Sequence, residues 1–135
     1  MAELEVLLFD VDGTLADTER DGHRVAFNKA FAEAGLDWDW TVELYDDLLS
    51  VTGGKERIRF YLEKYLPEFE PQAGITAFAA QLHQRKTHFY LEMLQQGEIP
   101  LRNGVERLLE AARFAGLRLG IATTTTPENV TYLLK

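Results

Sequence analysis

The sequence predicts an α/β protein in which part of a Rossmann-like parallel sheet carries an inserted domain of α-helices. Two short apolar runs, Val6–Phe9 and 117–122, have the length and composition of fully buried strands in a parallel sheet. Between them, residues 17–95 show helical periodicity throughout and no strand pattern. We therefore expect an α/β core formed by residues 1–16 and 96–135, interrupted by a helical cap over residues 17–95.

The expected core is incomplete in this chain. A sheet of only two parallel strands leaves apolar faces uncovered and edges unpaired. We therefore expect the remainder of the core to come from a missing C-terminal segment or from another chain.

The first strand runs directly into Asp10-Val11-Asp12-Gly13-Thr14. In open parallel sheets, ligands bind at the carboxyl ends of the strands, so this stretch is better suited to chemistry than to a plain acidic surface turn. Asp10 could attack phosphorus as a nucleophile, and Asp12 could act as the general acid and base. Gly13 would let backbone N–H groups approach a phosphoryl group. Two carboxylates facing a phosphate dianion require a screening cation, and Mg²⁺ is the natural choice.

The inserted region predicts four helices. The first is capped by Asp17 or Thr18 and ends at Gly35, and Thr41 caps the second. The third opens at Gly53-Gly54 and stops before Pro67, and the fourth carries apolar residues at helical spacing from Ile75 to Met93.

The second part of the core begins with a helix that starts near Val105 and is ended by Gly116. The second strand follows, and Thr126 with Pro127 predicts the start of a last helix. Thr123 follows this strand, so its hydroxyl would lie beside Asp10 if the two strands are neighbours. It could then donate to a phosphoryl oxygen, with the backbone N–H of Thr124 in the same role. The alternative is that both are ordinary turn residues.

Gly53-Gly54-Lys55 opens a helix with a basic residue at its start. Backbone N–H groups and the helix dipole could bind an anion at Gly54, with Lys55 adding charge. A P-loop is excluded because the preceding strand and the Gly-Lys-Ser/Thr ending are missing. The alternative is a plain turn between helices, with Lys55 and Arg57 in solvent.

Composition excludes several classes of function. The net charge of −8 and a pI of about 4.8 argue against nucleic acid or anionic membranes as partners. The absence of cysteine excludes disulfides and thiolate sites. The N-terminal residues do not resemble a signal peptide, and no apolar run reaches membrane length. We expect a cytoplasmic or organelle-soluble protein, and a removed transit peptide would leave no trace.

Residues 9–15, Phe-Asp-Val-Asp-Gly-Thr-Leu, resemble the first signature motif of the haloacid-dehalogenase-like superfamily of phosphohydrolases. The resemblance implies that Asp10 is the nucleophile and Asp12 the acid/base group of a phosphatase or phosphomutase. It also implies a Mg²⁺ site formed by the Asp10 carboxylate, the Asp12 carbonyl and a later acidic residue. Residues 119–123 resemble the second motif, which ends at Thr123.

Three further segments, residues 17–19, 52–58 and 122–127, resemble the CbbY-type sugar-phosphate phosphatases, relatives of β-phosphoglucomutase. This implies that the loop at Gly54 and Lys55 contacts the far end of a sugar phosphate. It also implies that Glu19 and His23, at the hinge between core and cap, touch substrate and acid/base group. His23 lies one residue further along than the hinge histidine of β-phosphoglucomutase, whereas His83 and His88 are expected on a solvated helix face.

The sequence therefore favours a Mg²⁺-dependent phosphatase that hydrolyses a small sugar phosphate or bisphosphate through an aspartyl-phosphate. A phosphomutase and a non-catalytic fragment that binds a phosphometabolite or a partner remain alternatives. The lysine and the acidic pair of the family's third and fourth motifs do not occur up to Lys135. We therefore expect residues 1–135 alone to lack phosphatase activity, and the cap to be their more stable part.

Overall fold

A computed structural model of the chain describes residues 3–134, so residues 1, 2 and 135 of the expected core lie outside the described residues. The described residues form two compact units. The first unit contains residues 3–22 and 93–134, and the second is His23–Glu92. These boundaries differ by a few residues from those expected for core and cap, and the assignment of the second unit as a cap stays a prediction.

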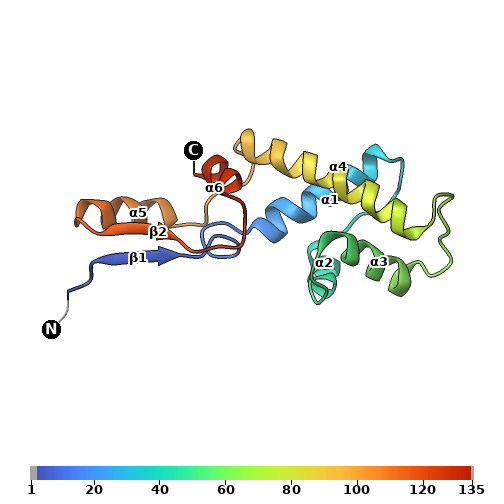
Figure 1. Ribbon diagram of the computed structural model, residues 1–135, viewed down its shortest axis with the longest axis horizontal. Helices are drawn as coiled ribbons and strands as arrows, with labels where there is room; N and C mark the ends of the chain where they lie inside the picture. Colours follow the sequence, from blue (N-terminus) through green and yellow to red (C-terminus); the bar gives the residue numbers. More distant parts are fainter. Residues whose placement is uncertain (1–2, 135) are drawn as a thin grey trace. The chain divides into compact units, whose positions relative to one another are not determined.

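The first unit is built on a parallel pair of strands (Figure 1). Strand β1 (Val6–Phe9) pairs with β2 (Arg118–Ile121), and Phe9 is opposite Ile121. Helix α5 (Val105–Phe114) contacts β2, and α6 (Pro127–Leu133) follows it. Parallel strands joined through a helix confirm the predicted α/β class.

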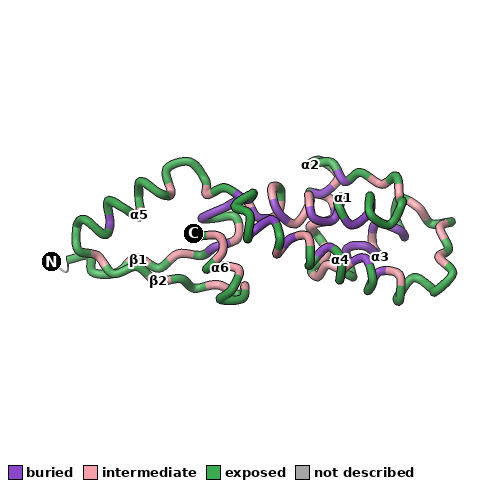
Figure 2. The backbone as a smooth tube through the Cα atoms, turned by 90° about the horizontal axis from the view of Figure 1, so that it is seen from above, coloured by how far each residue is buried: buried purple, intermediate pink, exposed green. Residues whose placement is uncertain are grey.

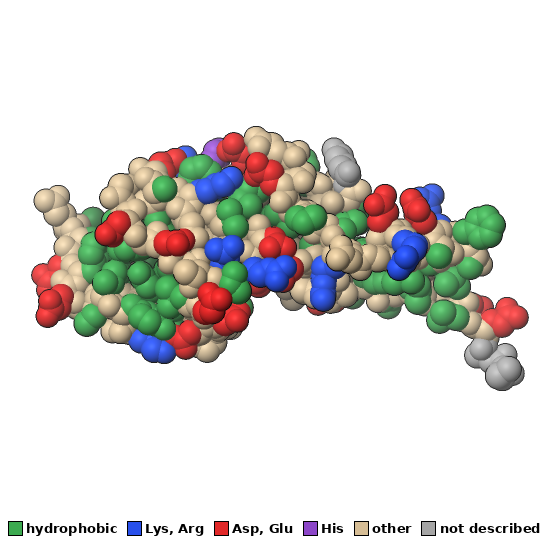
Figure 3. Space-filling model, turned by 180° about the vertical axis from the view of Figure 1, so that it is seen from behind, with side chains coloured by type: hydrophobic (Ala, Val, Ile, Leu, Met, Phe, Trp, Pro, Cys, Tyr) green, Lys and Arg blue, Asp and Glu red, His purple; other side chains and the backbone are tan. Residues whose placement is uncertain are grey.

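Both strands are more exposed than the sequence predicts. The expected fully buried first strand is wrong for the described residues, because Leu8 is 70% exposed and Val6 is 43% exposed. On α5, Phe114 is 96% exposed. Figure 2 colours β1, β2 and α5 mostly as exposed, and Figure 3 shows hydrophobic side chains on the surface of this unit. The physical reason is that, within residues 3–134, no further strand flanks the pair and no second layer covers its open face.

The inserted region contains the four predicted α-helices, preceded by one turn of π-helix, η1 (Thr18–His23). They are α1 (Arg24–Glu33), α2 (Val42–Leu48), α3 (Gly54–Tyr65) and α4 (Ile75–Gln95). Two predicted N-caps are confirmed, since Thr41 accepts a hydrogen bond from the N–H of Leu44 and Thr126 from that of Asn129. The cap predicted for the first helix is wrong for α1, because the π turn precedes it and its N-cap, His23, makes no side-chain capping bond. Among the described residues, no helix combines the length and apolar character needed to cross a bilayer.

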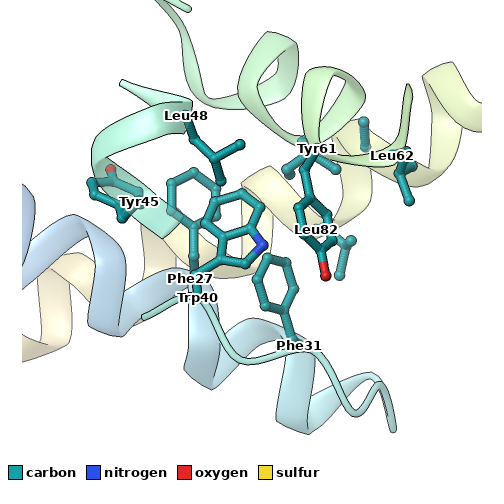
Figure 4. Close-up of a cluster of buried hydrophobic side chains, with 10 residues drawn as sticks. Phe27, Phe31, Trp40, Tyr45, Leu48, Tyr61, Leu62 and Leu82 are labelled. Carbon is teal, nitrogen blue, oxygen red and sulfur yellow. The ribbon is translucent and has the colours of Figure 1, made fainter. Parts of the chain in front are cut away.

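The second unit has its own core, centred on the indole of Trp40 (Figure 4). The rings of Phe27 and Phe31 lie 4.8 Å from Trp40, and the ring of Tyr61 lies 5.3 Å away. Asn28 fixes the Trp40 backbone from α1, because its amide accepts from the N–H and donates to the carbonyl at 2.8 and 3.0 Å. Each fully buried large side chain of this kind contributes about 1.5–3 kcal/mol, which supports an independently stable unit.

Candidate active site

Asp10 and Thr123 follow neighbouring strands at the same edge of the sheet. The pairing of Phe9 with Ile121 continues one residue further, where the Ala122 N–H donates to the Phe9 carbonyl at 2.8 Å. The two strands are therefore neighbours, which is the condition for placing Thr123 at the same edge as Asp10. Asp10 is exposed to solvent, and its nearest hydrogen-bonding contact is a long one, 3.5 Å from the Thr14 hydroxyl. This leaves the carboxylate accessible to a substrate.

The loop after β1 is a compact turn whose shape follows from its sequence. The carbonyl of Val11 accepts from the N–H groups of Thr14 and Leu15 at 3.1 and 2.9 Å. Val11, Leu15 and Ala16 are buried and anchor the turn in the unit. Gly13 has φ +79°, a left-handed conformation that strongly favours glycine. The buried apolar side chains fix the position of the loop, and the loop in turn holds Asp10 and Asp12 in place.

The structure refines the role expected for Gly13. Its own N–H donates to the carbonyl of Ala16 at 2.8 Å and is therefore used within the loop. A Cβ at Gly13 would meet nothing within 4 Å, so the space beside this residue is open. Gly13 can thus leave room for a phosphoryl group, while a direct contact with phosphate stays a prediction.

Asp12 is oriented by a residue whose role sequence reasoning missed. The hydroxyl of Thr18 donates to Oδ1 of Asp12 at 2.6 Å, and Thr18 is only 1% exposed. This bond occupies one carboxylate oxygen and fixes the direction of the other. From the sequence, Thr18 is expected only as a helix cap, but at the start of η1 it is Asp17 that accepts from the N–H of Arg20.

Thr123 is partly buried, and its hydroxyl accepts a hydrogen bond from the N–H of Thr125 at 3.1 Å. The hydroxyl proton remains able to donate, as the predicted phosphate contact requires. Thr124 is exposed. Both residues lie in the first unit with Asp10, Asp12 and Gly13.

The donor atoms near Asp10 suit a hard cation. A carboxylate and a backbone carbonyl are the oxygen ligands that Mg²⁺ prefers. Within residues 3–134, however, no group of three or more His, Cys, Asp or Glu side chains could hold a metal ion. A magnesium site at Asp10 and Asp12 therefore stays a prediction, and within residues 3–134 no third acidic side chain joins them.

The two residues predicted at the hinge, Glu19 and His23, lie in the π-helical turn η1. Glu19 is partly buried in this turn. A π turn contains one more residue per hydrogen-bonded turn than an α turn, and π turns occur frequently at functional sites.

His23 is held in the second unit by an aromatic and a cationic neighbour. Its ring stacks on Tyr90 at 4.0 Å, and Nδ1 lies 2.8 Å from the ammonium of Lys86, which is 7% exposed. Burial, with added repulsion from Lys86, Arg57 and His83, lowers the pKa of His23 to about 3. At neutral pH the imidazole is therefore uncharged and accepts from Lys86.

Gly54 and Lys55 begin α3, as predicted, and Lys55 is exposed. Gly54 packs against the imidazole of His83, and a Cβ at this position would overlap that ring. The expectation that His83 lies on a solvated face is wrong, whereas His88 is exposed as expected. Burial and the positive charges of Lys86 and Lys55 lower the pKa of His83.

Arg57 is also not a solvated residue, contrary to the plain-turn alternative. It is 9% exposed and donates to the carbonyls of Leu48 and Val51 and to the hydroxyl of Tyr45. These bonds fix the chain that precedes Gly53-Gly54. Helical periodicity gave no signal for these roles, because Arg57, Thr18 and His83 each contact a residue outside their own helix.

Comparisons with known proteins show which family the chain belongs to. The family model of haloacid dehalogenase-like hydrolases matches residues 4–135. The chain belongs to this family. It is 49% identical over 132 residues to the plasmid-encoded CbbY protein of Cupriavidus necator, a match that covers 98% of this chain and 52% of that protein. The resemblance inferred from the motifs is thereby confirmed.

Solved structures of related proteins share the fold. The CbbY protein of Rhodobacter sphaeroides, crystallised with phosphate, is 45% identical with a TM-score of 0.69, covering 97% of this chain and 56% of that one. A variant of the same protein in complex with xylulose-(1,5)bisphosphate is 44% identical, with the same TM-score and coverage. The chain thus spans about half the length of the relatives it matches.

Proposed function

We propose that the complete protein is a Mg²⁺-dependent phosphatase acting on a small sugar bisphosphate. The observation that carries this proposal is the position of Asp10 beside Thr123 at the carboxyl edge of paired parallel strands, with Asp12 oriented by Thr18. Phosphoryl transfer through a covalent phosphoenzyme needs an accessible carboxylate as nucleophile, a neighbouring hydroxyl donor and a second carboxylate held in a fixed orientation.

In the proposed mechanism, an oxygen of Asp10 attacks phosphorus, and the bond from phosphorus to the sugar oxygen breaks. Asp12 gives its proton to that oxygen, which leaves as the sugar hydroxyl. Asp12, now ionised, takes a proton from water as the water attacks the aspartyl-phosphate, releasing inorganic phosphate and restoring Asp10. General acid–base catalysis of this kind contributes about 10²–10⁴-fold, which makes the orientation of Asp12 by Thr18 important.

The Asp10 carboxylate and the Asp12 backbone carbonyl would hold Mg²⁺. When bound, the ion offsets the repulsion between these carboxylates and the phosphate. Thr123 and the N–H of Thr124 would donate to phosphoryl oxygens on the side of β2.

The second unit is proposed as the cap that recognises the remote end of the substrate. It presents the exposed cation Lys55 at the start of α3, beside the partly buried imidazole of His83, in a chain of net charge −8. The helix N-terminus at Gly54 adds backbone donors for an anion. The complex of the Rhodobacter sphaeroides relative with xylulose-(1,5)bisphosphate supports a substrate with a second phosphate. Glu19 and His23 are proposed to contact substrate or acid/base group at the hinge.

The remainder of the core is proposed to come from a further segment or another chain. This is supported by the exposed apolar side chains of β1, β2 and α5, and by the half-length coverage of the relatives. That remainder would supply the lysine and the acidic pair, so we expect no Mg²⁺-dependent turnover from residues 1–135 alone.

The experiment incubates the full-length protein with xylulose bisphosphate and Mg²⁺ and quantifies both inorganic phosphate and isomeric sugar phosphates. Release of one equivalent of phosphate per substrate is the expected result. An isomeric sugar bisphosphate without phosphate release would instead identify a phosphomutase. Binding of substrate without either product would identify a non-catalytic binding protein.

A further inference from the structure

Arg102 contacts the loop that carries the two aspartates at two points. Its Nη1 donates to the carbonyl of Gly13 at 2.8 Å, and its backbone N–H donates to the carbonyl of Leu15 at 2.7 Å. Arg102 and the loop lie in the same compact unit, although they are far apart in sequence. Arg102 therefore binds the carbonyl groups of the residues before and after Thr14.

The side-chain bond acts on the least anchored part of the loop. Val11, Leu15 and Ala16 are fixed by burial, whereas Gly13 and Thr14 are exposed. Gly13 also has the greatest conformational freedom, because glycine populates many backbone conformations. The peptide between Gly13 and Thr14 has two restraints: the Thr14 N–H donates to the Val11 carbonyl at 3.1 Å, and the Gly13 carbonyl accepts from Arg102. Without the guanidinium, only the first of these restraints remains.

The guanidinium is accessible from solvent. A cavity of about 370 Å³ lies beside it, lined mainly by polar residues: Asp17, Arg20, Asp21, Arg102 and Asn103. This volume is large enough to admit a small cation such as guanidinium. Arg102 is also exposed, so replacing it removes a contact without opening a hole in a packed core.

We propose that Arg102 is a positioning residue of the active site, whose bond to the Gly13 carbonyl keeps the loop in the conformation that aims Asp12 at the leaving group. This inference rests on the proposed phosphatase function. Arg102 contacts the backbone of the loop and acts through this backbone on Asp12, the residue that directly precedes Gly13.

The first arm of the test is independent of catalysis. Amide hydrogen exchange is measured in the full-length protein and its Arg102→Ala variant, with Arg113→Ala as a control that removes the same charge from an exposed site on α5. Loss of one hydrogen bond should speed exchange at the N–H groups of Gly13 and Leu15 about 2- to 10-fold. The control should leave these rates unchanged.

The second arm compares kcat/KM for an alkyl phosphate with kcat/KM for p-nitrophenyl phosphate. An alkoxide leaving group needs the proton of Asp12, whereas p-nitrophenolate leaves without it. Arg102→Ala should therefore lower kcat/KM about tenfold more for the alkyl ester. Millimolar guanidinium should restore part of this loss in Arg102→Ala and have no effect on Arg113→Ala.

The outcomes separate the two proposals. Faster loop exchange together with the selective, guanidinium-restored loss on the alkyl ester supports the inference. Unchanged loop exchange, or equal losses on both esters, overturns it, since equal losses indicate only a smaller fraction of folded enzyme. A wild-type protein that releases no phosphate would overturn the proposed function, while unchanged exchange would separately show that Arg102 does not hold the loop.

Discussion

The buried hydroxyl of Thr18 donates a 2.6 Å hydrogen bond to Oδ1 of Asp12. Thr18→Val keeps the shape of the side chain and removes the donor. We expect kcat to fall about tenfold, because a net hydrogen bond of about 1–1.5 kcal/mol no longer orients the acid/base group. KM should change little. Thr87→Val, at an exposed position of α4 where the hydroxyl bonds only its own helix, is the matched control. Unchanged kcat in Thr18→Val would exclude this orienting role.

Lys55 is predicted to recognise the remote phosphate of the substrate. Lys55→Ala should raise KM for a sugar bisphosphate about tenfold and leave p-nitrophenyl phosphate hydrolysis within about twofold, because the small ester does not reach the cap. Arg59→Ala, which removes a charge from the same helix at another exposed position, should affect neither. Equal effects of Lys55→Ala on both substrates would exclude Lys55 as a specificity contact.

Gly54 is predicted to be required for packing against His83. Gly54→Ala places a methyl group on the imidazole and should destabilise the protein by about 1–3 kcal/mol. His83→Ala removes the obstacle, so the double variant should recover most of this loss. Thermal unfolding of the wild type, the two single variants and the double variant provides a double-mutant cycle. The cycle measures the coupling free energy between the two positions. Additive effects of the two substitutions would contradict the contact.

His23 makes stability depend on pH in a defined window. Its folded-state pKa of about 3 lies below the ordinary value of 6.5, so the unfolded chain binds the proton first as pH falls. The contribution of the neutral His23 imidazole to the free energy of unfolding is complete above pH 6.5 and is lost as pH falls toward 3. Between pH 6.5 and 5 this loss should amount to about 2 kcal/mol.

The measurement is denaturant unfolding across that range for wild type, His23→Gln and His88→Gln, the last replacing an exposed histidine. His23→Gln should flatten the decline in stability between pH 6.5 and 5, and His88→Gln should leave it in place. A wild-type slope retained in His23→Gln would show that the buried imidazole is not its source.

Much of the fold could be predicted because its signals are local. The caps at Thr41 and Thr126 and the helix start at Gly54 depend on a few adjacent residues, and the structure has each of them. The two strands followed from apolar runs that end in polar residues, whereas their adjacency is a contact that only the structure shows. The positions of Asp10 and Thr123 at the ends of these strands were accessible from the sequence.

The features that could not be predicted from the sequence depend on contacts between separate segments. The exposure of Leu8 depends on which strands surround β1, and a short apolar run carries no information about this. The burial of Arg57, the packing of His83 on Gly54 and the bond from Arg102 to Gly13 each join separate elements. The π turn before α1 also left no periodicity to detect, because it is only six residues long.

The most direct test of the central claim is the turnover of Asp10→Asn in the full-length protein, with Asp39→Asn at an exposed position as its control. We expect Asp10→Asn to fold with unchanged stability but to release phosphate at least about a thousandfold more slowly, because the amide cannot form the aspartyl-phosphate. Asp39→Asn should behave as wild type. Phosphate release by Asp10→Asn within about tenfold of wild type would contradict the covalent mechanism.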